Sequence, residues 1–392
     1  MDLAAIQKTL DAHDLDGWLL YDFRGSNAIA RAVIGFDMSQ IATRRWFYLV
    51  PRSGEPVAIL HVIEPHALRG VPGRSVLYRS WRELEAQLKA HLAPLRRVAM
   101  EYSPRGAIPY VSRVDAGTIE MVRAAGPEVV SSADLVQIFE ARWTPEQKAL
   151  HDRAARDTLL VKDEAFDLVR GRVRAGKRIT ESEVQALISE RFRARGLFTH
   201  HPCIVAVNEH ASDPHFETSA GPDDRAIRRG DVVLIDLWAK VAEDPRAVYY
   251  DATWMGFCGE EVPPRVREVW EVVKGGRDAA IAFVKDAVAA GRTIHGWEVD
   301  DVSRGFIQSR GYGEYFLHRT GHSIGYEVHG NGVNIDNLET RDQRKIIPGV
   351  CFSIEPGVYL PEFGVRSEVD MYVGQESAEV TGDIQDDLLR LV

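Results

Sequence analysis

The amino-acid sequence predicts a mixed α/β protein with two domains, residues 1–143 and 144–392. Short apolar runs typical of strands alternate with helical patterns in the first part of the chain. The pattern changes after a strong helix-start signal near residue 144. A chain of 392 residues is also long enough for two domains that each bury a core of their own.

The first domain should contain a central sheet with helices packed against it. An amphipathic helix that includes Leu3, Ile6 and Leu10 comes first. Strand-like runs follow as GWLLYD, RWFYLV, VAILH and RVAMEY, with the helical stretch SWRELEAQLKAHL between the last two. Strands and helices that alternate in this way indicate an α/β layer.

Two helix starts in the second domain carry capping signals. The sequence TPEQ at residues 144–147 supplies an N-cap threonine, a proline in the first turn and a capping-box glutamine. We expect the long helix that starts there to bridge the two domains. The sequence TESE at residues 180–183 predicts a second helix that runs to about Gly196. Strand-like runs DVVLIDLWA, VCFSIEPGVY and VRSEVDMYV follow, interspersed with helices at about 262–290 and 297–310.

Composition and charge exclude several classes of protein. A net charge of -10, without any basic run, argues against nucleic acid and favours a small molecule or peptide as partner. No apolar run approaches the roughly 20 residues of a membrane span, and no signal-peptide layout opens the sequence, so we expect a cytoplasmic protein. The cysteines lie far apart, and we expect them to be reduced and buried: Cys203, Cys258 and Cys351.

Four carboxylates occupy segments that a fold would normally bury. Asp236 and Glu355 each end an apolar strand-like run, Asp251 follows two tyrosines, and Glu368 lies within GVRSEVDMYV. A buried carboxylate without a partner is costly, so such groups shift their pKa or bind a cation. Taken singly, each is more often an exposed strand-end cap or a salt-bridge partner. Together they carry four negative charges, which two divalent cations would neutralise.

The segment HRTGHSIGYEVHG, residues 318–330, places three histidines close together in the sequence. One imidazole with four carboxylates would form an oxygen-rich set that suits manganese, cobalt or iron and also allows zinc. Two such metals can lower the pKa of a shared water and supply a hydroxide nucleophile at neutral pH. Hydrolysis is therefore the leading reaction class.

The order of these residues resembles the metal ligands of the pita-bread metallopeptidases, which include methionine aminopeptidase, aminopeptidase P and prolidase: Asp236, Asp251, His322, Glu355 and Glu368. The similarity extends over roughly residues 145–385. The N-terminal stretch GWLLYDFRGSNAIARAVIGF resembles the creatinase-type domain that prolidases and aminopeptidase P carry. The resemblance implies a creatinase-type N-terminal domain, a pita-bread catalytic domain and two divalent metal ions, with Mn²⁺ expected first.

The resemblance also implies roles for individual side chains. Glu355 would bind metal and transfer a proton. His329 and His215 would contact the substrate near the scissile carbonyl, and His318 matches another histidine near the substrate in proline-specific members. Arg366 would orient a carboxylate and lie on the substrate side. His318 and His329 could instead be polar loop residues.

The chain departs from the family pattern at several positions. Asp236 and Asp251 are 15 positions apart, so AKVAEDPRAV contains an apparent insertion that should lengthen the hairpin between these ligands. Trp254 stands where the family has an arginine, and the acid often adjacent to the last ligand is displaced to Asp370. These changes leave the metal set intact and affect substrate contacts. His210 matches no motif position, and we interpret it as structural or solvent-exposed.

The pairing of the two domains favours the proline-specific branch of the family and, within it, a prolidase that cleaves Xaa-Pro dipeptides. Arg246, in the apparent insertion, could bind the carboxylate of a dipeptide or be a solvated loop arginine. Aminopeptidase P activity on longer peptides is an alternative, as is a metal-dependent hydrolase or lyase of a non-peptide substrate. A creatinase, or a binding module such as those of histone chaperones, would lack the five ligands. Relatives in this family are often dimers, so the resemblance also implies a homodimer.

Overall fold

The structure is a computed structural model that describes residues 1–36, 40 and 42–392. These residues form two compact units, Met1–Glu140 and Ala141–Val392. The mixed α/β class predicted from the sequence is confirmed. The long helix expected to bridge the domains instead begins inside the second unit, as α6 (Pro145–Arg174), because its apolar face is needed to cover that unit's sheet.

The first unit is built around a six-stranded mixed sheet. Its strands follow the order β4 (Arg74–Tyr78), β3 (Val57–His61), β2 (Trp46–Pro51), β1 (Gly17–Asp22), β5 (Arg97–Met100) and β6 (Glu128–Ser131). Its helices are α1 (Leu3–Ala12), α2 (Ala28–Ile34), α3 (Trp81–Leu92), α4 (Ala116–Ala124) and α5 (Ala133–Val136). Strand β1 is buried on both faces, since Trp18 packs in one apolar cluster and Leu19 in another. This explains its continuous apolar sequence.

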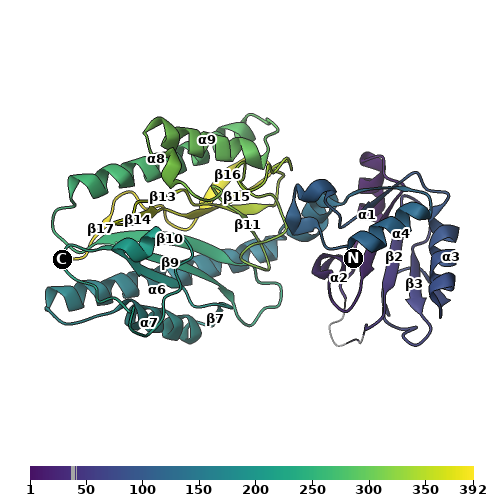
Figure 1. Cartoon of the computed structure of the whole chain (residues 1–392), viewed down its shortest axis with the longest axis horizontal. Helices are drawn as coiled ribbons and strands as arrows, with labels where there is room; N and C mark the ends of the chain where they lie inside the picture. The colour runs from purple at the N-terminus through teal and green to yellow at the C-terminus, as the bar shows by residue number, and fades with distance from the viewer. Residues whose placement is uncertain (37–39, 41) are drawn as a thin grey trace. The chain divides into compact units, whose positions relative to one another are not determined.

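The second unit contains two main sheets, each covered by a pair of helices (Figure 1). Helices α6 and α7 (Glu181–Ala194) pack on a sheet of β17 (Leu389–Arg390), β10 (Tyr250–Phe257), β9 (Val232–Val241) and β7 (Leu197–Phe198), with β8 (Ile204–Val207) paired to β9. Helices α8 (Pro264–Ala289) and α9 (Gly296–Ser309) pack on β11 (Ser323–Ile324), β12 (Cys351–Ile354), β15 (Val369–Val373) and β16 (Ala378–Thr381). A hairpin of β13 (Gly357–Tyr359) and β14 (Gly364–Arg366) completes the unit.

Most predicted elements of this unit are present, with two corrections. Both predicted capping boxes are formed, at Thr144 and Thr180. The runs VCFSIEPGVY and VRSEVDMYV, predicted as continuous strands, are each divided into two, β12 with β13 and β14 with β15. The breaks fall next to Glu355 and Glu368, so both glutamates lie where one strand has ended and another begins.

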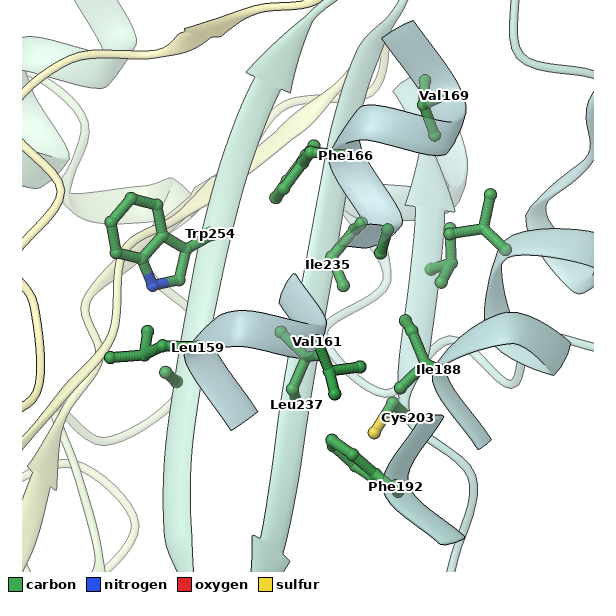
Figure 2. Packing of buried hydrophobic residues seen from close by; sticks show 14 of the residues in the cluster. Leu159, Val161, Phe166, Val169, Ile188, Phe192, Cys203, Ile235, Leu237 and Trp254 are labelled. Carbon is green, nitrogen blue, oxygen red and sulfur yellow. The ribbon is translucent and has the colours of Figure 1, made fainter. Parts of the chain in front are cut away.

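The core beneath α6 and α7 shows which face of the sheet of β9 and β10 is apolar. Ile235 and Leu237 on β9 point towards Phe166 of α6 and Ile188 of α7 (Figure 2). Because successive side chains of a strand point to opposite faces, Asp236 is directed to the other side. The three cysteines are buried and unpaired, as predicted. Among the described residues, none of the helices combines the length and the apolar character needed to cross a membrane.

Phe166→Ala should lower the free energy of unfolding of the second unit by about 3–5 kcal/mol, because it leaves a cavity in a dense core. Phe166 is only 1% exposed. Phe198→Ala is the matched control, since Phe198 is 46% exposed and its loss should cost less than about 0.5 kcal/mol. Chemical denaturation followed by tryptophan fluorescence measures both, and equal effects would contradict the packing described here.

His151 on α6 should make the protein less stable as the pH falls. Its buried ring contacts the Tyr249 carbonyl and the Thr381 hydroxyl at 2.7 Å each, and burial lowers its pKa from 6.5 to about 4. A lowered histidine pKa gives stability that is complete above pH 6.5 and is lost as the pH falls towards 4, here about 3 kcal/mol. In denaturation curves from pH 4.5 to 7.5, His151→Gln should remove this part of the slope, while His13→Gln, at an exposed site, should keep it. Equal slopes in all three proteins would refute the assignment.

Candidate metal centre

Both main sheets of the second unit contribute ligands to one buried site. Asp236 on β9 lies directly opposite Thr253 on β10, and Asp251 shares their face because it is two positions from Thr253. The second sheet supplies His322, immediately before β11, and Glu368, immediately before β15. Polar side chains of one sheet thus meet those of the other while the apolar faces turn outward to the helices.

The predicted ligands converge. The Nε2 atom of His322 lies 3.7 Å from Oδ2 of Asp251 and 3.3 Å from Oε1 of Glu355. One ligand atom each of Asp251, His322 and Glu368 lies within 4.8 Å of the other two, and all three residues are buried. Asp236 belongs to the same cluster through its electrostatic effect on the Asp251 carboxyl.

The electrostatics of the cluster favour a bound cation. Burial, followed by the charge of Asp236, raises the pKa of Asp251 well above its ordinary value. Burial and the charge of Asp251 do the same to the pKa of Glu368, and burial raises that of Glu355 to about 7. Among the described residues, no hydrogen-bond donor meets the buried Oδ1 atoms of Asp236 and Asp251. Buried acceptors of this kind are costly unless a metal or proton satisfies them.

The histidine of the cluster is arranged as a metal ligand. Burial lowers the pKa of His322 well below 6.5, so its ring is neutral. Its Nδ1 lies 3.3 Å from the Ser323 carbonyl, which can only accept, and the proton therefore sits on Nδ1. The lone pair on Nε2 then faces carboxylate oxygens, an arrangement that is favourable when a cation lies between them. The residues present thus fit divalent metal.

Arg366 and Thr253 hold two of the carboxylates in place. Arg366 forms an ion pair with Asp236 through Nη2 and donates from Nε to the Thr253 hydroxyl at 2.9 Å. That hydroxyl donates in turn to Oε2 of Glu368 at 2.7 Å. The sequence predicted an orienting role for Arg366. It gave Thr253 no role, although this residue lies two positions after the predicted ligand Asp251.

The predicted substrate-side histidines surround this cluster in different ways. The ring of His329 lies 4.3 Å from that of His322, edge to face, and desolvation, followed by the charge of Arg319, lowers its pKa to about 4. His318 is partly buried, with its Nε2 at 2.7 Å from the Tyr359 hydroxyl. His215 is exposed, and its charge acts on the pKa values of both Asp236 and His329. Sequence reasoning missed Tyr359, because an isolated buried tyrosine carries no motif.

The departures from the family pattern have distinct structural outcomes. Asp370 is fully buried, and its Oδ2 accepts a hydrogen bond of 2.8 Å from the Asp251 backbone, so the displaced acid supports a ligand. Trp254 packs in the apolar core beneath α6, on the face of β10 opposite to Asp251 and Thr253, and the Lys162 ammonium lies 3.7 Å from the centre of its ring. Arg246 is exposed and forms two hydrogen bonds with Asp244, at 3.0 and 2.8 Å. The solvated-loop interpretation of Arg246 therefore describes it better than a site cation.

The fold and the convergent ligand set define a metallopeptidase of the pita-bread class. Residues 153–375 match the sequence model of metallopeptidase family M24, and because this is more than half of the chain, the protein belongs to that family. It is 36% identical over 170 residues to an Xaa-Pro dipeptidase of Lactobacillus delbrueckii subsp. lactis, covering 42% of this chain and 40% of the relative. It is 26% identical over 315 residues to the putative dipeptidase YkvY of Bacillus subtilis, covering 79% and 77%.

Solved structures support the same fold over both units. Dipeptidase PepE from Mycobacterium ulcerans superposes with a TM-score of 0.70 at 23% identity, covering 99% of this chain and 96% of that one. An Xaa-Pro dipeptidase from Bacillus anthracis superposes with a TM-score of 0.67 at 21% identity, covering 99% and 98%. The pita-bread fold expected from the sequence is confirmed.

Asp251→Ala should reduce metal binding without unfolding the protein. We expect wild-type protein reconstituted with Mn²⁺ to hold two ions per chain and to unfold at higher temperature than the chelated form. The stabilisation should be about 2.7 kcal/mol when free metal is 100 times the Kd. Elemental analysis and thermal unfolding measure both effects, and Glu327→Ala, at an exposed acid, is the control. Full occupancy and full stabilisation in Asp251→Ala would exclude it as a ligand.

Proposed function

We propose that this protein is a dinuclear metallopeptidase that cleaves the bond before proline in Xaa-Pro dipeptides. The observation that carries the proposal is the convergence of one neutral imidazole and several buried carboxylates, two of which have an oxygen that meets no donor among the described residues. The names of the relatives, Xaa-Pro dipeptidase and putative dipeptidase, supply the substrate class. In this proposal, the second unit carries the active site and the first is the creatinase-type domain. The metal ligands are Asp236, Asp251, His322, Glu355 and Glu368.

Bound divalent ions would polarise the scissile carbonyl and lower the pKa of a water molecule in the site. Glu355 would take the proton from that water and return it to the proline nitrogen, a role supported by the position of its carboxyl, whose Oε1 lies 3.3 Å from Nε2 of His322 in the cluster.

The histidines would act on the substrate. Neutral His329 can donate one hydrogen bond towards the scissile carbonyl as negative charge develops on it, and His215 can donate another from the exposed side of the cluster. His318 would lie on the substrate side, and its contact with Tyr359, whose hydroxyl also lies 3.5 Å from Nη1 of Arg366, supports this assignment. Arg366 would thus contribute both to the substrate side and to the position of Asp236.

One observation favours a second candidate, an aminopeptidase that accepts longer Xaa-Pro peptides. A dipeptidase needs a cation for the substrate carboxylate, and Arg246 is occupied by Asp244 on an exposed loop. If no other cation serves, longer peptides would bind equally well. Manganese is our first expectation for the metal, with cobalt, zinc or iron as further possibilities. The homodimer and the cytoplasmic location also stay predictions.

Metal-reconstituted protein should hydrolyse an Xaa-Pro dipeptide and leave a proline-free dipeptide intact, and chelation should abolish the reaction. Chromatography of the released amino acid measures the rate of hydrolysis, and the rate for the dipeptide is compared with that for an Xaa-Pro-Yaa tripeptide. Cleavage of the tripeptide at a comparable rate would favour the second candidate. Glu355→Gln should lower kcat at least about 100-fold, whereas Glu362→Gln, at an exposed glutamate, should not. Two bound metals with no cleavage of any proline peptide would refute the proposal and point to a non-peptide substrate.

A further inference from the structure

We propose that His210 is a positioning residue that acts through His215, by holding the loop in which His215 lies. The inference rests on the proposed function, because it assigns His215 to the substrate side. Sequence reasoning left His210 as structural or solvent-exposed, and its side chain is in fact only 18% exposed. It lies in the short 3-10 turn η4 (Asn208–Ser212), directly before the loop.

His210 is fixed from one side by Glu181, in the first turn of α7. The Nδ1 atom of His210 lies 2.9 Å from each carboxylate oxygen of Glu181, whose side chain is only 1% exposed. The same carboxylate accepts hydrogen bonds from the backbone N–H groups of Val207, at 2.8 Å, and Arg225, at 3.1 Å. A carboxylate with several well-placed donors is held rigidly, so it determines where the imidazole stands.

The face of the imidazole contacts the loop that contains His215. The ring of His210 stacks on that of Phe216, with centroids 4.2 Å apart and planes 24° from parallel. Phe216 also packs against the apolar cluster that contains Ala211 and Val365. Since Phe216 directly follows His215, the stack constrains the backbone on the C-terminal side of that histidine.

The N-terminal side of His215 is tied to the metal cluster. Arg366, which pairs with Asp236, donates from Nη1 to the Pro214 carbonyl at 3.1 Å. Close packing limits movement further, since a Cβ on Gly364 would lie only 1.8 Å from the Ala211 carbonyl oxygen. His215 therefore lies between two contacts that fix the loop. The hydrogen bond from Arg366 to Pro214 connects it to the metal cluster, and the stack of His210 on Phe216 does not. Removing His210 should free His215 without changing a metal ligand.

A double-mutant cycle tests whether His210 acts through His215. With Mn²⁺ and an Xaa-Pro dipeptide, His210→Ala should lower kcat/KM about 10- to 100-fold, mainly through kcat, while the metal content stays that of wild type. In a His215→Ala background, His210→Ala should cause little further loss, because residues that act as one unit are not additive. The exposed His13→Ala is the control. The same fold-loss in both backgrounds, or no loss in wild type, would overturn the inference.

Hydrogen exchange separates this inference from the proposed function. In His210→Ala, amides of residues 211–217 should exchange faster than in wild type, while those of β9 and β10 should be unchanged. His210→Phe retains a ring for the stack and should give slower exchange than His210→Ala. Unchanged exchange at 211–217 would overturn the inference even if wild-type protein cleaves Xaa-Pro. If wild-type protein cleaves no proline peptide, the proposed function fails, and the exchange still shows whether His210 orders the loop.

Discussion

The second unit is organised around carboxylates that repel one another in a site with little access to water. Asp236 has an arginine partner, yet burial and the charge of Asp236 raise the pKa of Asp251, and burial and the charge of Asp251 raise that of Glu368. Such a cluster persists only if a rigid frame holds its members together and a cation or protons neutralise them. The frame is the pair of sheets, whose outer faces are apolar and covered by α6 and α7 on one side and by α8 and α9 on the other.

Close backbone approach is the second requirement of that frame. Gly321, next to His322, faces the carbonyl of Ser353, and a Cβ at this position would lie 1.9 Å from that oxygen. The backbone N–H of Ser353 meanwhile donates to the His322 carbonyl at 2.8 Å. Only glycine allows the loop of His322 to lie this close to β12 and thereby brings the imidazole to Glu355. The geometry of the candidate ligands thus depends on Gly321, a residue that has no functional side chain.

The sequence allowed the cluster of candidate ligands to be predicted because carboxylates inside apolar runs are conspicuous, and because their order resembles a known family. It predicted the elements well where the signal was strong, as in the amphipathic period of α3 and the continuous apolar run of β1. It failed at the divided strands, because the alternation of GVRSEVDMYV continues through the break before Glu368. It could not reveal the contacts of Thr253, Tyr359 and Glu181, since each joins segments that are distant in the chain and only the fold brings them together.

The hydroxyl of Thr253 has one further consequence. It accepts from Arg366 and donates to Glu368, so the single proton it carries has only one direction in which to point. Asp236 and Glu368 belong to different sheets, yet this oriented hydroxyl and Arg366 connect them in one line of polar contacts. Perturbations at these two carboxylates will therefore not be energetically independent, although the residues come from different sheets.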